Sequence, residues 1–179
     1  KLAVYHLLKG SKPALLVSGM NHGSNISINV LYSGTMSAAV EGAMESIPSI
    51  GFGLMDHRIE ARFEHVRPVI RSITANVLDK GLPRGTCLNV NVPSEDSGTL
   101  KGVRVCRQAW GFWEDDFEAR KDPMGKDYFW LRGRFTDQDH GEDTDTWAVA
   151  NGFASVVPVQ FDMTAHHAIA ELNTWDHAR

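Results

Sequence analysis

The most constraining feature of the sequence is an apolar run at residues 14–17 (Ala-Leu-Leu-Val), followed at once by a loop rich in glycine and asparagine. A short continuous apolar run is typical of a strand buried on both faces, as in a parallel sheet. After the loop, residues 36–44 form a helical segment of small residues, and residues 47–54 again resemble a strand. This order of strand, loop, helix and strand is the repeating unit of doubly wound α/β folds.

Later segments continue the alternation. Helical periodicity predicts a second long helix over residues 62–78, and apolar runs predict further strands at residues 87–92 and 153–159. The sequence therefore predicts one α/β domain over residues 1–179, with a Rossmann-like, doubly wound and mostly parallel sheet. The chain starts inside a helical pattern that we expect to end at Gly10, so we expect the domain to be incomplete at its N-terminus.

Two segments do not fit the alternation. We expect residues 103–132 to form a β-hairpin excursion, because strand-like runs flank an aperiodic stretch with several aromatic residues. Residues 164–179 are predicted to form a C-terminal helical arm. A short helix between these segments is predicted to begin at Asp145, as its N-cap.

Composition limits the possible functions. The 22 acidic and 18 basic side chains give a net charge of −4, which argues against stable binding to nucleic acid. No apolar run is long enough to span a bilayer.

Cys87 and Cys106 lie in strand-like runs, where they could pair; we expect them to be buried, reduced thiols of a cytoplasmic protein. The sequence has no P-loop, no nucleophile elbow and no dinucleotide-binding glycine motif.

The first candidate site is the loop after residues 14–17. It contains Ser18, Gly19, Asn21 and Asn25 in the pattern Ser-Gly-x-Asn-x-Gly-x-Asn. In open α/β sheets ligands bind beyond the carboxyl ends of the strands, and glycines let the backbone approach a ligand. Asn21 offers an amide oxygen for a hard cation, and Asn25 could hold the loop or contact substrate. The alternative is that these residues only form turns.

The second candidate site is the start of the small-residue helix, at Ser33, Gly34 and Thr35. Free backbone N–H groups and the helix dipole attract an anion there, and the two hydroxyls could add hydrogen bonds. The alternative is an ordinary N-cap. The two candidate sites lie in consecutive loops, so we expect them to meet at one edge of the sheet.

Stretches that resemble motifs of the survival-protein-E (SurE) 5′/3′-nucleotidase family recur in order across almost the whole chain. They are residues 18–25, 32–42, 47–50, 88–93, 122–131 and 144–152, with Ser155 and Pro158. The chain departs from the family pattern at Met36, where valine is commoner, and at Gly51 and Gly53, which replace residues that are commonly alanine and serine.

The resemblance implies a metal-dependent phosphomonoesterase that hydrolyses nucleoside 5′- and 3′-monophosphates to nucleoside and phosphate. The family opens with a strand and an Asn-Asp-Asp-Gly motif whose aspartates bind the metal. That motif is absent from residues 1–179, so we expect the catalytic aspartate and most metal ligands in an upstream segment. Asn21 is the implied ligand that can be placed. Oxygen ligands suit Mg²⁺ or Mn²⁺.

Within the chain, the residues implied to bind the substrate phosphate come from both candidate sites: Ser18, Gly19, Asn25, Ser33, Gly34 and Thr35. The resemblance also implies a homodimer or tetramer built through the hairpin and the C-terminal arm. The alternative is a non-catalytic α/β module for binding or assembly, since most metal ligands lie outside the chain.

Overall fold

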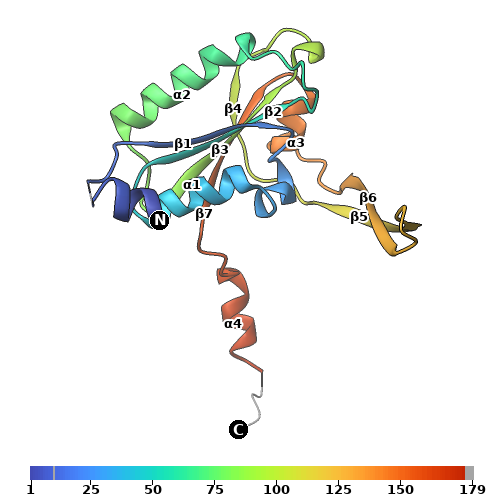
Figure 1. Cartoon of the computed structure of the whole chain (residues 1–179). Coiled ribbons are helices and arrows are strands. Elements are labelled where there is room, and N and C mark those ends of the chain that lie inside the picture. Colours follow the sequence, from blue (N-terminus) through green and yellow to red (C-terminus); the bar gives the residue numbers. More distant parts are fainter. Residues whose placement is uncertain (10, 176–179) are drawn as a thin grey trace.

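The computed structural model describes residues 1–9 and 11–175, and shows an α/β fold around a mixed, mostly parallel sheet (Figure 1). The five strands lie in the order β1-β2-β3-β7-β4. Their bounds are β1 Leu16–His22, β2 Ser49–Met55, β3 Thr86–Pro93, β4 Val103–Val105 and β7 Ala154–Gln160. Strand β3 pairs antiparallel with β7, and the other neighbours in the sheet pair parallel. The predicted fold class is confirmed.

The helices are α1 Gly34–Met44, α2 Arg67–Lys80, α3 Asp145–Ala150 and α4 Ile169–Leu172. Shorter 3₁₀ turns lie at Ser27–Leu31, Glu64–Val66, Glu95–Ser97 and His166–Ala168, and a π-helical turn lies at Ala3–Leu7. The segment predicted as a helix from residue 1 is therefore a single short turn, and Gly10, its predicted end, lies outside the described residues.

Strand β2 explains how helices pack on both faces of the sheet. Its apolar residues Ile50, Phe52 and Leu54 belong to the same buried cluster as the apolar face of α2. The alternate positions face α1, and there the strand is nearly without side chains. A Cβ atom at Gly51 would lie 2.4 Å from Met36 Sδ, so the glycine allows α1 to pack directly on the strand. Figure 1 shows α1 and α2 on opposite sides of the sheet.

The hairpin lies at a different place from the predicted one. Residues 103–105 form β4 in the main sheet, and the hairpin consists of β5 Gly111–Lys121 and β6 Asp127–Asp137. The predicted hairpin, residues 103–132, therefore begins before the observed start at Gly111 and ends before the observed end at Asp137. The aperiodic stretch after residue 108 is in fact a long strand, paired in register with β6 from Gly111↔Asp137 to Lys121↔Asp127. Because its face does not cover a core, it carries no regular apolar alternation.

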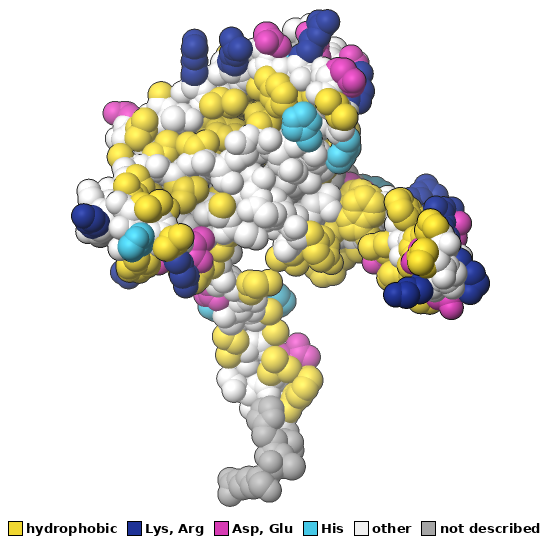
Figure 2. Space-filling view, in the orientation of Figure 1, with side chains coloured by type: hydrophobic (Ala, Val, Ile, Leu, Met, Phe, Trp, Pro, Cys, Tyr) yellow, Lys and Arg dark blue, Asp and Glu magenta, His cyan; other side chains and the backbone are white. Residues whose placement is uncertain are grey.

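The hairpin and the C-terminal segment project from the body in different directions (Figure 1). The predicted helix over residues 164–175 is reduced to a 3₁₀ turn and the short α4, and residues 176–179 of the predicted arm lie outside the described residues. Apolar side chains lie on the surface of both projections (Figure 2). Within the part of the chain that the structure describes, no helix has the length and apolar character needed to cross a membrane.

Candidate functional site

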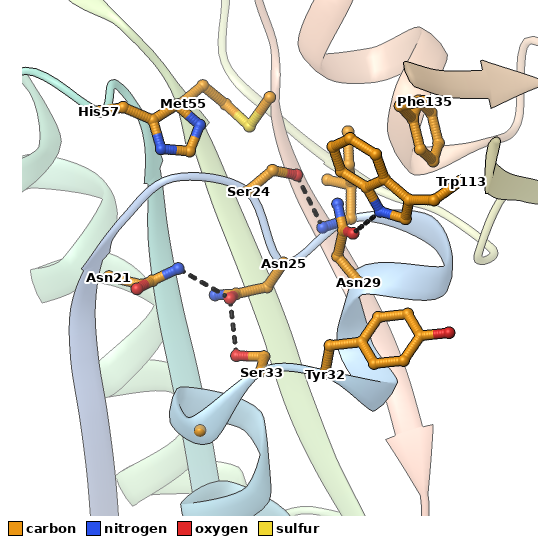
Figure 3. Close-up of a pocket in the computed structure, with 12 residues that line it drawn as sticks. Asn21, Ser24, Asn25, Asn29, Tyr32, Ser33, Met55, His57, Trp113 and Phe135 are labelled. Atoms are coloured by element: carbon orange, nitrogen blue, oxygen red, sulfur yellow. Dashed lines mark hydrogen bonds between the residues drawn. The ribbon is translucent and has the colours of Figure 1, made fainter. Parts of the chain in front are cut away.

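The two predicted sites meet in one pocket beyond the carboxyl ends of β1 and β2 (Figure 3). The pocket has a volume of about 430 Å³. Its lining residues are Asn21, Ser24, Asn25, Ile26, Asn29, Tyr32, Ser33, Gly34, Met55, His57, Trp113 and Phe135. This arrangement agrees with the expectation that the two loops converge at this edge of the sheet. None of the lining residues carries a carboxylate.

Asn25 is the central residue of the polar wall. Its side chain is fully buried, and its Oδ1 accepts hydrogen bonds from Asn21 Nδ2 at 3.1 Å and from Ser33 Oγ at 2.7 Å. Its backbone is held from below by strand β3: the N–H donates to Asn91 Oδ1 at 2.8 Å, and the carbonyl accepts from Asn89 Nδ2 at 2.7 Å. The asparagine network therefore ties the loop after β1 to the start of α1.

Gly53 makes room for this network. In the sheet it lies between Asn21 on β1 and Asn91 on β3. A Cβ atom on Gly53 would be 2.7 Å from both Asn25 Nδ2 and Asn91 Oδ1, so any side chain there would displace the buried amide. Asn25 Nδ2 itself is buried without a hydrogen-bond partner among the described residues. The glycine at residue 53, which departs from the family pattern, thus leaves the space that the buried amide of Asn25 occupies.

The start of α1 forms the anion-binding candidate. Ser33 is its N-cap, and Ser33 Oγ accepts a hydrogen bond from Met36 N at 3.1 Å. Helix geometry leaves the backbone N–H groups of Gly34 and Thr35 without intrahelical acceptors. The Ser33 hydroxyl, in contrast, gives its one proton to Asn25 Oδ1. Backbone donors at Gly34 and Thr35, rather than the predicted Ser33 hydroxyl, are therefore the groups available to an anion.

The amide of Asn21, the predicted metal ligand, is held in one orientation. Its Nδ2 donates to Asn25 Oδ1 and to the carbonyl of Gly23 at 3.2 Å, which turns its Oδ1 away from Asn25 (Figure 3). In this orientation the amide oxygen of Asn21 does not face Asn25. An amide oxygen is the kind of ligand that Mg²⁺ and Mn²⁺ accept. The described residues contain no group of three or more His, Cys, Asp or Glu side chains that could hold a metal ion. Asn21 alone does not make a metal site, and its role as a ligand stays a prediction.

Three predicted substrate residues do not line the pocket. Ser18 is half-buried within β1 opposite Gly51, and Thr35 packs its methyl group near the same glycine. Gly19 has a φ of +115°, and a Cβ atom there would lie 2.4 Å from the carbonyl oxygen of Phe52. In this structure Gly19 shapes the strand backbone, and direct contact with substrate stays a prediction for all three residues.

The opposite wall of the pocket is aromatic, and sequence reasoning missed it. Trp113 and Phe135 come from the hairpin, and their rings meet edge to face with centroids 5.8 Å apart. Trp113 Nε1 donates a hydrogen bond of 2.7 Å to Asn29 Oδ1, across 84 residues of sequence. Tyr32, beside the predicted Ser33, also lines the pocket. The alternating asparagines Asn89 and Asn91 in an apolar strand are a sequence signal for the polar network. The sequence around Trp113 contains no comparable signal that this residue lines the pocket.

Asp145 joins the hairpin to the loop that carries Asn29. The structure corrects the prediction that Asp145 is the N-cap of α3: the cap is Thr144, whose side chain accepts from Trp147 N. The Asp145 carboxylate is buried and accepts from Ser27 N at 2.8 Å and Ala109 N at 2.9 Å. Burial raises the pKa of this carboxyl, although the backbone donors oppose that shift. One buried carboxylate therefore links the segment just before the hairpin to the turn that carries Asn29.

Both cysteines are buried and unpaired, as predicted. Burial raises the pKa of the Cys87 thiol to about 11, and burial also raises the pKa of Cys106. A thiol with a raised pKa is a poor nucleophile, so neither cysteine is a candidate for covalent catalysis.

Comparison with known proteins agrees with the fold and the motifs. The family model described as survival protein SurE matches residues 1–115. The 5′-nucleotidase SurE of Flavobacterium psychrophilum is 60% identical over 98% of this chain and 68% of its own length, and that of Cytophaga hutchinsonii is 54% identical over 97% and 67%. The crystal structure of the SurE protein from Aquifex aeolicus has a TM-score of 0.77 and 35% identity, over 96% of this chain and 69% of that chain. The chain belongs to the SurE family.

Proposed function

We propose that this chain provides the phosphate-binding part of a metal-dependent phosphomonoesterase that hydrolyses nucleoside 5′- and 3′-monophosphates to nucleoside and phosphate. The observation that carries the proposal is the pocket in which the start of α1 lies beside Asn21. Support also comes from the relatives named 5′-nucleotidase SurE, at 54–60% identity. The names of these relatives do not favour the alternative, a non-catalytic binding or assembly module.

In this proposal the backbone N–H groups of Gly34 and Thr35 hold phosphate oxygens, aided by the positive end of the α1 dipole. Ser33 and Asn25 keep that helix end fixed against the end of β1, where Asn21 lies. A bound Mg²⁺ or Mn²⁺, held by Asn21 and by carboxylates from outside the described residues, would polarise the phosphoryl group and acidify a water. Phosphoryl transfer depends mainly on positioning and charge stabilisation, so a neutral pocket of amides and backbone donors suits it.

The reaction is tested by incubating the complete protein with nucleoside 5′- and 3′-monophosphates and measuring released phosphate. We expect release from both substrates, its loss on chelation of divalent cations, and its return with Mg²⁺ or Mn²⁺. Release that is unchanged after exhaustive chelation would contradict the metal requirement, and release from 5′-monophosphates alone would contradict the 3′ activity.

Substitution of Gly34 by valine tests the anion site. A Cβ atom on Gly34 meets no protein atom within 4 Å, so Gly34→Val should fold normally and place its methyl groups where phosphate would bind. We expect inorganic phosphate to inhibit the parent competitively with substrate, and this inhibition to weaken by about tenfold or more in the variant, the loss of roughly one charge-assisted hydrogen bond.

The matched control is Ser37→Val, on an exposed position of the same helix and outside the pocket. It introduces the same β-branched residue into the helix, with the further loss of the hydrogen bond that Ser37 Oγ donates to the carbonyl of Ser33 at 2.9 Å. If phosphate inhibits Gly34→Val and Ser37→Val equally, the anion site lies elsewhere.

We also propose that the complete protein is a homodimer or tetramer held by the two projections. Apolar side chains on the surface of the hairpin include Phe117, Phe129 and Leu131, and those of the C-terminal segment include Met163 and Trp175. Neither set folds back on the core (Figures 1 and 2). Apolar surface of this extent usually marks an interface, and exchange of such arms between subunits forms dimers at low cost.

Removal of the residues after Met163 should therefore shift the complete protein toward monomer and lower its melting temperature. The double substitution Ile169→Glu with Trp175→Glu should do the same without shortening the chain, because both side chains are exposed here. Asn173→Glu is the control that adds charge without removing apolar surface. Light scattering at micromolar concentration reports the mass, and a monomer mass for the parent would refute the assembly.

A further inference from the structure

The pocket has two chemically different ends. At one end α1 begins, with Gly34 in the lining and its backbone N–H without an intrahelical acceptor. At the other end Trp113 and Phe135 form an apolar wall supplied by the hairpin (Figure 3). Both ends line the same cavity of about 430 Å³, within the range of small-molecule sites. A ligand that fills this cavity needs an anionic group at one end and a planar apolar group at the other.

The Trp113 ring is held in a fixed orientation. Its Nε1 donates to Asn29 Oδ1 at 2.7 Å, and its ring meets Phe135 at an interplanar angle of 66°. The side chain nevertheless keeps 40% of its surface exposed. A ring that is fixed at one edge and open on its surface can stack on a planar ligand with little further loss of conformational entropy.

Trp113 also borders a second hollow, of about 370 Å³, which it shares with Tyr32, Asp115, Leu131 and Gly133. This second hollow contains a carboxylate and is not lined by Gly34 or Ser33. A phosphorylated ligand there would face the charge of Asp115, and the start of α1 does not line this hollow. The side of Trp113 that faces the first pocket is therefore the side available to such a ligand.

We propose that the base of the nucleoside monophosphate stacks on Trp113 while its phosphate binds at the start of α1. This inference rests on the proposed function and adds a role for the hairpin, which becomes one wall of the substrate site. Stacking tolerates any base because every base has a π-face, so the wall selects for a nucleoside without selecting among bases. The Asn29 hydrogen bond makes Asn29 a positioning residue for the indole.

The test separates the two ends of the pocket with two probes, adenosine and inorganic phosphate, each titrated calorimetrically into the complete protein. In Trp113→Ala we expect the affinity for adenosine to fall about tenfold or more, within the range for loss of one stacked base, while the affinity for phosphate is unchanged. Gly34→Val should show the reverse pattern. Trp113→Phe should restore adenosine binding to within about threefold, because it keeps an aromatic face.

Two variants serve as controls. Trp130→Ala removes the same side chain from the same hairpin, where it packs with Arg120 and not in the pocket. Leu131→Ala enlarges the second hollow and leaves the lining of the first pocket unchanged. Both should bind adenosine as the parent does. Loss of adenosine binding in Leu131→Ala but not Trp113→Ala would move the base to the other hollow and overturn the inference.

Other results of the same titrations distinguish base stacking from a purely structural role and from the proposed reaction. Absence of adenosine binding to the parent at millimolar concentration, or equal loss of adenosine and phosphate in Trp113→Ala, would overturn base stacking; the second result would make Trp113 a structural support of the hairpin. If adenosine and phosphate bind as expected but no nucleoside monophosphate is hydrolysed, the proposed reaction fails and the stacking site stands.

Discussion

Substitution of Asn21 by alanine should lower the hydrolysis rate of the complete protein by about 100-fold or more, the range for a lost group that stabilises transition-state charge. The structure presents the Asn21 amide with its Nδ2 held by Asn25 and Gly23 and its Oδ1 turned away. If that oxygen ligates the metal, the Mn²⁺ concentration for half-maximal activity should rise as well. This second measurement separates loss of a ligand from a general disturbance of the loop.

The control for Asn21→Ala is Asn76→Ala. Asn76 lies exposed on α2, and its Nδ2 donates to the carbonyl of Ser72, so its removal costs a comparable side-chain hydrogen bond away from the pocket. We expect parental activity and an unchanged Mn²⁺ requirement. Undiminished turnover of Asn21→Ala at saturating Mn²⁺, with an unchanged half-maximal concentration, would show that Asn21 is not a ligand.

Gly19→Ala should produce the largest loss of stability among the glycine substitutions considered, about 3 kcal/mol or more in the free energy of unfolding. Two effects add. The φ of +115° is unfavourable for a residue with a side chain, and the new Cβ would lie 2.4 Å from the backbone oxygen of Phe52, which cannot move without disturbing β2. Denaturant unfolding monitored by circular dichroism measures the difference.

Gly81→Ala separates the two effects. Gly81 also has a positive φ, of +71°, but a Cβ there meets no atom within 4 Å. With a ψ of −170° it lies in a backbone region that is almost restricted to glycine, so its substitution should cost about 1–3 kcal/mol, from backbone conformation alone. Equal losses in Gly19→Ala and Gly81→Ala would show that close packing against Phe52 contributes nothing, and would reopen a direct role for Gly19 in ligand binding.

The sequence was sufficient for the parts of the fold that local patterns determine. The apolar run before Ser18 and the small residues of α1 predicted a strand and a helix that the structure contains, although β1 continues to His22, through the first residues of the predicted loop. The convergence of Asn21 and Gly34 followed from their places in consecutive segments beyond one sheet edge, where ligands bind in open α/β sheets. These inferences needed only periodicity, glycine placement and capping chemistry, all of which act over a few residues.

Long-range pairing explains what the sequence could not predict. Trp113 reaches the pocket because β5 pairs with β6 and because Asn29 accepts its hydrogen bond, and neither contact leaves a local pattern. The Ser33 hydroxyl was expected to bind phosphate, yet its proton is used by Asn25. Asp145 resembled a cap by position, but its carboxylate bonds the backbone of residues far away in the chain.

The most direct test of the account is phosphate release from a nucleoside 5′-monophosphate by the complete protein, its Gly34→Val variant and its Ser37→Val control. The account predicts equimolar nucleoside and phosphate from the parent and the control, with strongly reduced release from Gly34→Val at equal stability. Absence of phosphate release by the parent in Mg²⁺ or Mn²⁺, or full release by Gly34→Val, would contradict the assignment of the start of α1 as the site of the substrate phosphate.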